Sequence, residues 1–132
     1  MDKRITEEIE LLKKYYKNTS YKEEGQWVAI KDYPLPAGFP WNRAITDICF
    51  QIPVPYPGSP PYGFYVPAGI LYKGSRPGSY TEPANSSPPF QGTWGFFSWA
   101  KDNSWFATDS VSSGSNLLTF VWTFTDRFSE GV

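Results

Sequence analysis

The residue types that most often carry chemistry are scarce in this chain. Its 132 residues include no histidine and one cysteine, Cys49. The missing histidine removes the commonest general base and the commonest metal ligand, and with them every histidine-based catalytic triad. A single cysteine forms no disulfide within the chain and no cysteine cluster for a metal. We therefore expect no metal and no cofactor.

Cys49 lies within residues 45–52, whose alternation of apolar and polar side chains predicts a β-strand. One face of this strand would carry Ile48, Phe50 and Ile52. The other, wetter face would carry Asp47, Cys49 and Gln51. A free cysteine there is expected to be half-buried and to pack as a small hydrophobic residue. The alternative is that Cys49 is a displaced nucleophile.

Aromatic residues make up 19% of the chain and are its clearest compositional excess. Many of them gather in residues 94–99, with two more at positions 105 and 106. Such density most often forms a core beneath a long loop, because each ring buries a large area. The alternative is a stacking platform for a glycan or a proline-rich peptide, built from Trp94, Phe96, Trp99, Trp105 and Phe106.

Charge and hydropathy exclude several classes of partner. The chain has 12 basic and 13 acidic residues and a net charge of −1, which points to neither nucleic acid nor an anionic membrane surface. No apolar run approaches the roughly 18 residues of a membrane span, and the charged start lacks the features of a signal peptide. We expect a cytoplasmic protein with one domain, residues 1–132.

Two amphipathic helices are predicted, one at each end of the chain. Residues 2–17 place Ile5, Ile9, Leu12 and Tyr16 on one stripe. A second helix over residues 115–129, capped by Ser115 or Asn116, places Leu117, Val121, Phe124 and Phe128 on another. The first helix would pack on a sheet or offer a docking surface to a partner.

Between the helices the pattern changes to short strands, which are predicted at residues 26–30, 45–52 and 64–66. We expect an α+β fold with a meander of about four antiparallel strands. Sixteen of the forty residues from Pro53 to Gly92 are proline or glycine, so the chain should leave the sheet over residues 53–66 before the short third strand. Residues 73–92 are the most loop-like and are a candidate for mobility.

The order of these elements, with Tyr56-Pro57, two further residues and then Pro60-Pro61 after the meander, resembles the YPxxPP signature of ubiquitin-conjugating (E2) enzymes. The chain is most similar to a divergent bacterial branch, prokaryotic E2 family E, in the stretches DYPLPAGFPWN, TDICFQIPVPYPGSPP and GFYVP followed by FFSW. The resemblance covers nearly the whole chain and implies a UBC-like fold. In that fold Tyr56, Pro57, Pro60 and Pro61 are scaffold residues that brace a long irregular segment.

The resemblance fails where an E2 enzyme holds its partner as a thioester. That cysteine follows the proline pair and precedes a tryptophan by a few residues, but no cysteine lies between Pro61 and Trp105. Ser98, seven residues before Trp105, is close to that place and is a weak candidate for an oxyester acceptor, with Asp102 to orient the incoming group. A serine hydroxyl is barely nucleophilic without a base. Two versions remain open, a noncanonical carrier and a cysteine-less scaffold.

The resemblance also implies partners. The chain would act in a bacterial ubiquitin-like conjugation pathway and bind an E1-like activating enzyme and a ubiquitin-like modifier. Docking on the E1-like enzyme would involve the polar face of the first helix, with Lys3, Arg4 and Lys13. The alternative function is a stand-alone aromatic-rich module that binds a peptide or a glycan.

Overall fold

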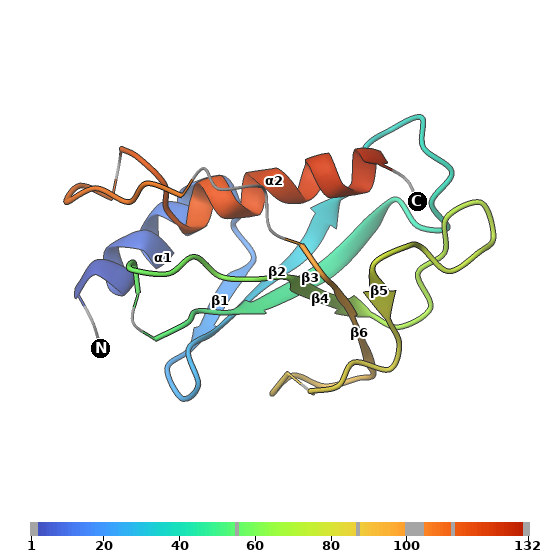
Figure 1. The fold of residues 1–132 in the computed structure, drawn as a ribbon, viewed down its shortest axis with the longest axis horizontal. Helices are drawn as coiled ribbons and strands as arrows, with labels where there is room; N and C mark the ends of the chain where they lie inside the picture. Colours follow the sequence, from blue (N-terminus) through green and yellow to red (C-terminus); the bar gives the residue numbers. More distant parts are fainter. Residues whose placement is uncertain (1–2, 55, 87, 100–104, 112, 131–132) are drawn as a thin grey trace.

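The computed structural model describes residues 3–54, 56–86, 88–99, 105–111 and 113–130, and it has an α+β fold (Figure 1). A helix near each end of the chain flanks a six-stranded antiparallel sheet with strand order β1-β2-β3-β4-β6-β5. The elements are α1 (Lys3–Tyr15), β1 (Thr19–Lys22), β2 (Trp27–Pro34), β3 (Ile45–Gln51), β4 (Phe64–Pro67), β5 (Tyr80–Thr81), β6 (Trp94–Phe97) and α2 (Leu117–Glu130).

Both predicted helices are present and their apolar stripes are buried, except that Tyr16 lies just after the end of α1 and is half-buried. Ile5, Ile9 and Leu12 lie on one side of α1, as their spacing predicts. Asn116 caps α2, because its side-chain oxygen accepts the Thr119 N–H at 2.8 Å while the Asn116 N–H donates to the Thr119 hydroxyl at 2.9 Å. Neither helix, within the ranges the structure describes, is long and apolar enough to cross a membrane.

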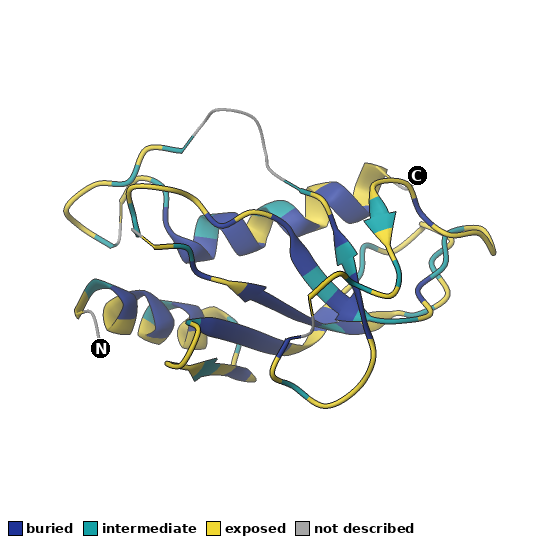
Figure 2. Ribbon diagram, turned by 60° about the horizontal axis from the view of Figure 1, so that its bottom comes forward, coloured by how far each residue is buried: buried dark blue, intermediate teal, exposed yellow. Residues whose placement is uncertain are grey.

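The main core lies between the helices and one face of the sheet. Helix α2 runs along that face (Figure 1), and the stripes of both helices join the inward side chains of β2, β3, β4 and β6 in one cluster. The rings of Phe64 and Phe124 stack with centroids 4.1 Å apart. The buried Tyr33 hydroxyl donates a hydrogen bond to the Val121 carbonyl at 3.0 Å, so it is not left without a partner in the core. Colouring by burial shows the central strands buried and the surrounding loops largely exposed (Figure 2).

The opposite face of the sheet is also covered, which corrects the expectation of a wetter face around Cys49. Cys49 is fully buried and packs with Ala29 and Trp94 in a second cluster. Phe90 and Tyr65 close over this cluster. On this face of β3, Asp47 is half-buried and Gln51 is exposed, so the strand is covered at its middle and meets solvent toward its ends.

The sheet has six strands where the sequence predicts about four. Strand β4 is at the expected position. The chain leaves the sheet after Gln51 and returns to it at Phe64, so the segment outside the sheet is shorter than the predicted residues 53–66. Strands β1, β5 and β6 were not predicted. Each is four residues or shorter, and β6 lies in the aromatic run, whose pattern does not alternate.

Candidate functional site

The turn that carries the YPxxPP sequence is fastened to two distant parts of the chain. Tyr56 donates its hydroxyl proton to the Glu8 carboxylate at 2.7 Å. Trp105 donates its indole N–H to the Pro57 carbonyl at 2.9 Å, and the rings of Tyr56 and Trp105 lie 6.0 Å apart. Pro61 is buried and Pro60 is exposed. The turn is therefore braced by side chains that come before and after it in the sequence.

Glu8 connects this turn to both helices. Its side chain has no exposed surface. One carboxylate oxygen accepts Tyr56 and the backbone N–H of Leu117 at 2.6 Å, and the other accepts the guanidinium of Arg4 at 2.8 Å. Leu117 is the first residue of α2, where unpaired N–H groups and the helix dipole favour a negative charge. Burial and the Glu8 carboxylate both raise the pKa of Tyr56.

Glu8 was not identified from the sequence, although a signal was present. It lies three residues after Ile5 and directly before Ile9, so it falls on the apolar stripe of α1. A carboxylate at such a position is almost never fully buried unless it is paired. The partners could not be named from sequence, since two of them lie 48 and 109 residues away.

The three cations expected to dock an E1-like enzyme do not have equivalent surroundings. Arg4 is bound to Glu8 and donates a second hydrogen bond to the carbonyl of Thr108. Lys3 is exposed, and Lys13 is exposed with its ammonium 3.8 Å from Glu10. Lys3 and Lys13 are accessible to a partner, whereas the guanidinium of Arg4 makes hydrogen bonds within the protein.

Ser98 directly follows β6 and is exposed. It lines an open pocket of about 460 Å³ together with Tyr62, Gly78, Ser79, Trp99, Arg127 and Glu130. The Ser98 N–H donates to the Ser79 carbonyl at 2.8 Å, which ties the end of β6 to the segment before β5. In the described part of the chain no hydrogen bond joins a base to the Ser98 hydroxyl. Asp102 lies outside the described residues.

Arg127 supplies a positive charge to the Ser98 pocket, but its guanidinium is already engaged in contacts within the protein. It is 2% exposed, lies 4.7 Å from the centre of the Phe97 ring and donates to the Gly78 carbonyl. Burial lowers the pKa of this guanidinium. Ser98 thus has a cation and the carboxylate of Glu130 as neighbours in the pocket, but no assembled pair of nucleophile and base.

Cys49 has the surroundings of an inert thiol. It is fully buried, and burial, with a smaller contribution from Asp47, raises the pKa of the thiol far above its ordinary value of 9.0. The expectation of a half-buried residue was therefore wrong. A thiol that stays protonated and covered is not a nucleophile. Across the ranges that the structure describes, no group of three or more potential metal-binding side chains occurs.

The aromatic residues around β6 do not form one platform. The three indoles donate their N–H groups inside the fold: Trp94 to Phe90, Trp99 to Thr123 and Trp105 to Pro57. Trp94 is buried, whereas Phe106 is 75% exposed. Of the five residues considered, Phe96 lines a pocket with the rings of Tyr62 and Tyr65, and Trp99 lines the Ser98 pocket with Tyr62.

Comparisons with protein-family models, with curated proteins and with solved structures give no significant match for this chain.

Proposed function

We propose that this chain is an E2-like scaffold in a bacterial ubiquitin-like conjugation pathway, where it binds an E1-like enzyme and a ubiquitin-like modifier without carrying the modifier covalently. The observation that supports this proposal is the Tyr56–Pro61 turn and its anchoring. A terminal helix, the strands β1, β2 and β3, this turn, the strand β4 and finally the helix α2 across one face follow one another along the chain, and this order of elements supports the resemblance. Glu8 and Trp105 then fix the turn at its two sides.

Neither of the two possible acceptors, Cys49 and Ser98, is suited to form a covalent bond with the modifier. The Cys49 thiol is buried with Ala29 and Trp94, and its pKa is raised. It therefore stays protonated, and a protein partner cannot reach it. The Ser98 hydroxyl is accessible, but it is not hydrogen-bonded to a base in the described residues, and the sequence contains no histidine. Noncovalent binding of a modifier requires neither a nucleophile nor a base.

The E1-like partner would dock on the solvent-facing side of α1. Lys3 and Lys13 are exposed there, and so are Glu7 and Glu10, which gives this side both signs of charge. Exposed charges at the rim of an interface act mainly on the rate of association and on its dependence on salt. Because fold-level analogy does not establish function, the partners themselves must be tested.

The direct test is a binding titration of this protein with the E1-like enzyme and the ubiquitin-like modifier encoded in the same genome. We expect saturable binding to both, without any requirement for ATP. A chain that binds neither protein, at concentrations where those two proteins bind each other, would contradict the proposal. Genes for an E1-like enzyme, a modifier and a JAB-type peptidase beside its own gene would favour it.

A further inference from the structure

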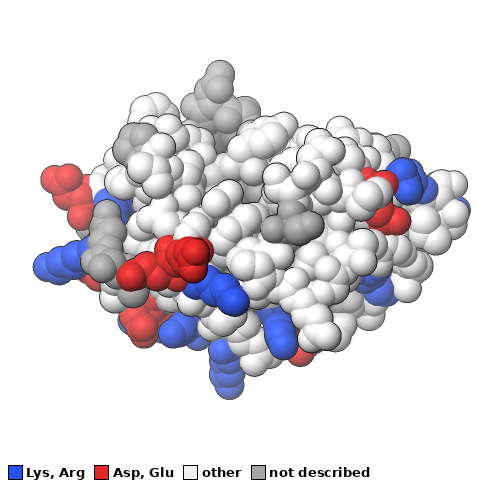
Figure 3. All heavy atoms as spheres, turned by 90° about the horizontal axis from the view of Figure 1, so that it is seen from below, with Lys and Arg blue, Asp and Glu red and all other residues white. Residues whose placement is uncertain are grey.

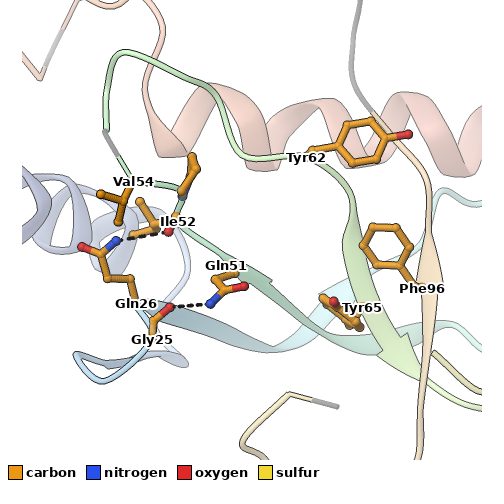
Figure 4. Close-up of a pocket in the computed structure, with 9 residues that line it drawn as sticks. Gly25, Gln26, Gln51, Ile52, Val54, Tyr62, Tyr65 and Phe96 are labelled. Carbon is orange, nitrogen blue, oxygen red and sulfur yellow. Dashed lines mark hydrogen bonds between the residues drawn. The ribbon is translucent and has the colours of Figure 1, made fainter. Parts of the chain in front are cut away.

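A second pocket lies on the opposite side of Tyr62 from the Ser98 pocket, and none of the preceding proposals uses it. Its volume is about 590 Å³, within the usual range for ligand sites. It is bounded by the chain just before β2, by the end of β3 and by the start of β4 (Figure 4). The lining residues are Gly25, Gln26, Gln51, Ile52, Pro53, Val54, Tyr62, Tyr65 and Phe96.

None of these lining residues is charged, although 19% of the chain is. The face seen in Figure 3 likewise carries its charged side chains toward its ends and lower edge, with a broad uncharged area between them. A charged ligand would lose its hydration in this pocket without gaining an opposite charge. The lining therefore fits an uncharged segment.

Three tilted rings form one wall. The ring of Phe96 lies 6.4 Å from that of Tyr62, at an interplanar angle of 47°, and 4.8 Å from that of Tyr65, at 55°. At these distances each pair of rings is in contact, and the tilts mean that the three rings do not lie in one plane. Tyr62 is 61% exposed, so its ring stands out as the ridge between this pocket and the Ser98 pocket.

The position of Phe96 depends on Gly63. A Cβ atom added to Gly63 would lie 2.1 Å from the Phe96 ring, and the φ of +73° at this residue is one that side chains other than glycine rarely adopt. Only glycine lets the ring lie directly against the backbone at the start of β4. The wall is thus built into the fold and does not depend on a mobile side chain.

Two glutamines form the opposite wall, and each is held by the backbone. Gln51 donates from its amide nitrogen to the Gly25 carbonyl at 2.9 Å, and Gln26 donates to the Ile52 carbonyl at 3.1 Å (Figure 4). A side-chain amide has two N–H donors and an acceptor oxygen, so each keeps hydrogen-bonding capacity beyond this one bond. Fixed amides of this kind suit the carbonyl groups of an extended backbone.

We propose that this pocket binds an uncharged, proline-rich segment of a partner protein in the polyproline II conformation. Proline rings can pack on the exposed surface of the aromatic wall formed by Tyr62, Phe96 and Tyr65. The backbone carbonyls, which have no intrachain partner in this conformation, accept hydrogen bonds from the glutamine amides.

The test is a titration of ¹⁵N-labelled protein with acetyl-decaproline amide, followed by the backbone amide signals. We expect saturable shifts at Gln51, Tyr62, Tyr65 and Phe96, and none with a glycine–serine peptide of the same length. Tyr62→Ala removes the ridge and should weaken binding about tenfold, as for a central aromatic contact. Tyr15→Ala is the matched control, because Tyr15 is 59% exposed on α1 and does not line this pocket.

Three results would overturn the proposal. They are no saturable shift at millimolar decaproline, equal affinity in wild type and Tyr62→Ala, and shifts in this pocket with cellohexaose but not with decaproline. Binding to the E1-like enzyme and to the modifier is measured separately, so failure here leaves the proposed scaffold function untouched, and the reverse also holds.

Discussion

The hydroxyl of Tyr56 donates a 2.7 Å hydrogen bond to the carboxylate of Glu8, which lies 48 residues earlier in the chain and has no exposed surface. The same carboxylate oxygen accepts the first N–H of α2. One buried side chain thus sets the positions of the first helix, the proline-rich turn and the last helix relative to one another.

Removal of the Glu8 carboxylate should strongly destabilise the protein. In Glu8→Ala the Tyr56 hydroxyl, the Leu117 N–H and the Arg4 guanidinium each lose an acceptor, and we expect a loss of about 3–5 kcal/mol in the free energy of unfolding. Tyr56→Phe removes one hydrogen bond and should cost about 1–2 kcal/mol. Urea unfolding measures both, with the exposed neighbour Glu7→Gln as the control. Equal stability of Glu8→Ala and Glu7→Gln would refute the role of Glu8.

Cys49 should not react with thiol reagents while the protein is folded. The thiol is covered by Trp94 and Phe90, and burial raises its pKa. We expect slow labelling under native conditions and labelling of one thiol per chain in denaturant. Cys49→Ala should leave a folded protein that is about 1–2 kcal/mol less stable. Rapid labelling of the folded protein would mean that the second cluster opens readily.

The same raised pKa predicts the effect of alkaline pH. The folded chain holds the Cys49 proton more tightly than the unfolded chain, whose thiol titrates near its ordinary value of 9.0. The contribution to stability is therefore complete below this pH and is lost as the pH rises toward the folded pKa. Tyr33 and Tyr56, whose pKa values burial also raises, add to the loss above 10.0. Cys49→Ala should flatten the part of the curve that begins near pH 9.

Glu82 should hold the loop-rich segment before β6 in a pH-dependent way. Its carboxylate accepts the Tyr80 hydroxyl at 2.6 Å and the Gly69 N–H at 2.7 Å, and these bonds lower the pKa of Glu82. Their stabilisation is present above the ordinary pKa of 4.5 and is lost as the pH falls through the lower folded value.

Amide hydrogen exchange of Gly69 at neutral pH tests this contact. Glu82→Gln replaces a charged acceptor by a neutral one and should speed exchange about tenfold. The exposed Glu24→Gln is the control. The same measurement tests the predicted mobility of residues 73–92, since protection across the segment would argue against a mobile loop. Unchanged exchange at Gly69 in Glu82→Gln would show that other contacts hold the segment.

Charge reversal on α1 should separate docking from folding. Lys3→Glu and Lys13→Glu change exposed charges, and we expect slower association with the E1-like enzyme and an altered salt dependence, with no change in stability. Arg4→Glu places a second carboxylate beside Glu8 and should unfold or strongly destabilise the chain. If the two lysine reversals leave both affinity and salt slope unchanged, the docking surface lies elsewhere.

The local parts of this fold could be predicted from sequence, and the long-range parts could not. The stripe of Ile5, Ile9 and Leu12 and the cap at Asn116 depend on neighbours within a few residues, and the structure contains both. The alternation in residues 45–52 predicted β3 but not what covers Cys49. The covering residues Phe90 and Trp94 come from a segment more than forty residues later, without a regular pattern.

In the candidate sites, too, local features could be predicted from sequence and long-range contacts could not. Ser98 and the YPxxPP turn were named from position along the chain, whereas Glu8 gains its importance from contacts 48 and 109 residues away. The pocket of Tyr62, Tyr65 and Phe96 was also not predicted, because β4 pairs with β6 across residues 68–93, where the only strand in the described residues is the short β5. The sequence favoured a core for the aromatic residues, and the alternative platform included Phe96 but neither Tyr62 nor Tyr65.

The function proposed above requires that this protein bind the ubiquitin-like modifier without forming a covalent bond to it. The most direct test incubates it with the E1-like enzyme, the modifier and ATP, and records its intact mass with and without a thiol reductant. With an E1-like enzyme shown to activate the modifier, we predict no adduct on wild-type protein, and the same result for Cys49→Ala and Ser98→Ala. A reductant-sensitive adduct that is lost in Cys49→Ala, or a reductant-resistant adduct that yields to hydroxide and is lost in Ser98→Ala, would contradict the account and make this protein a carrier.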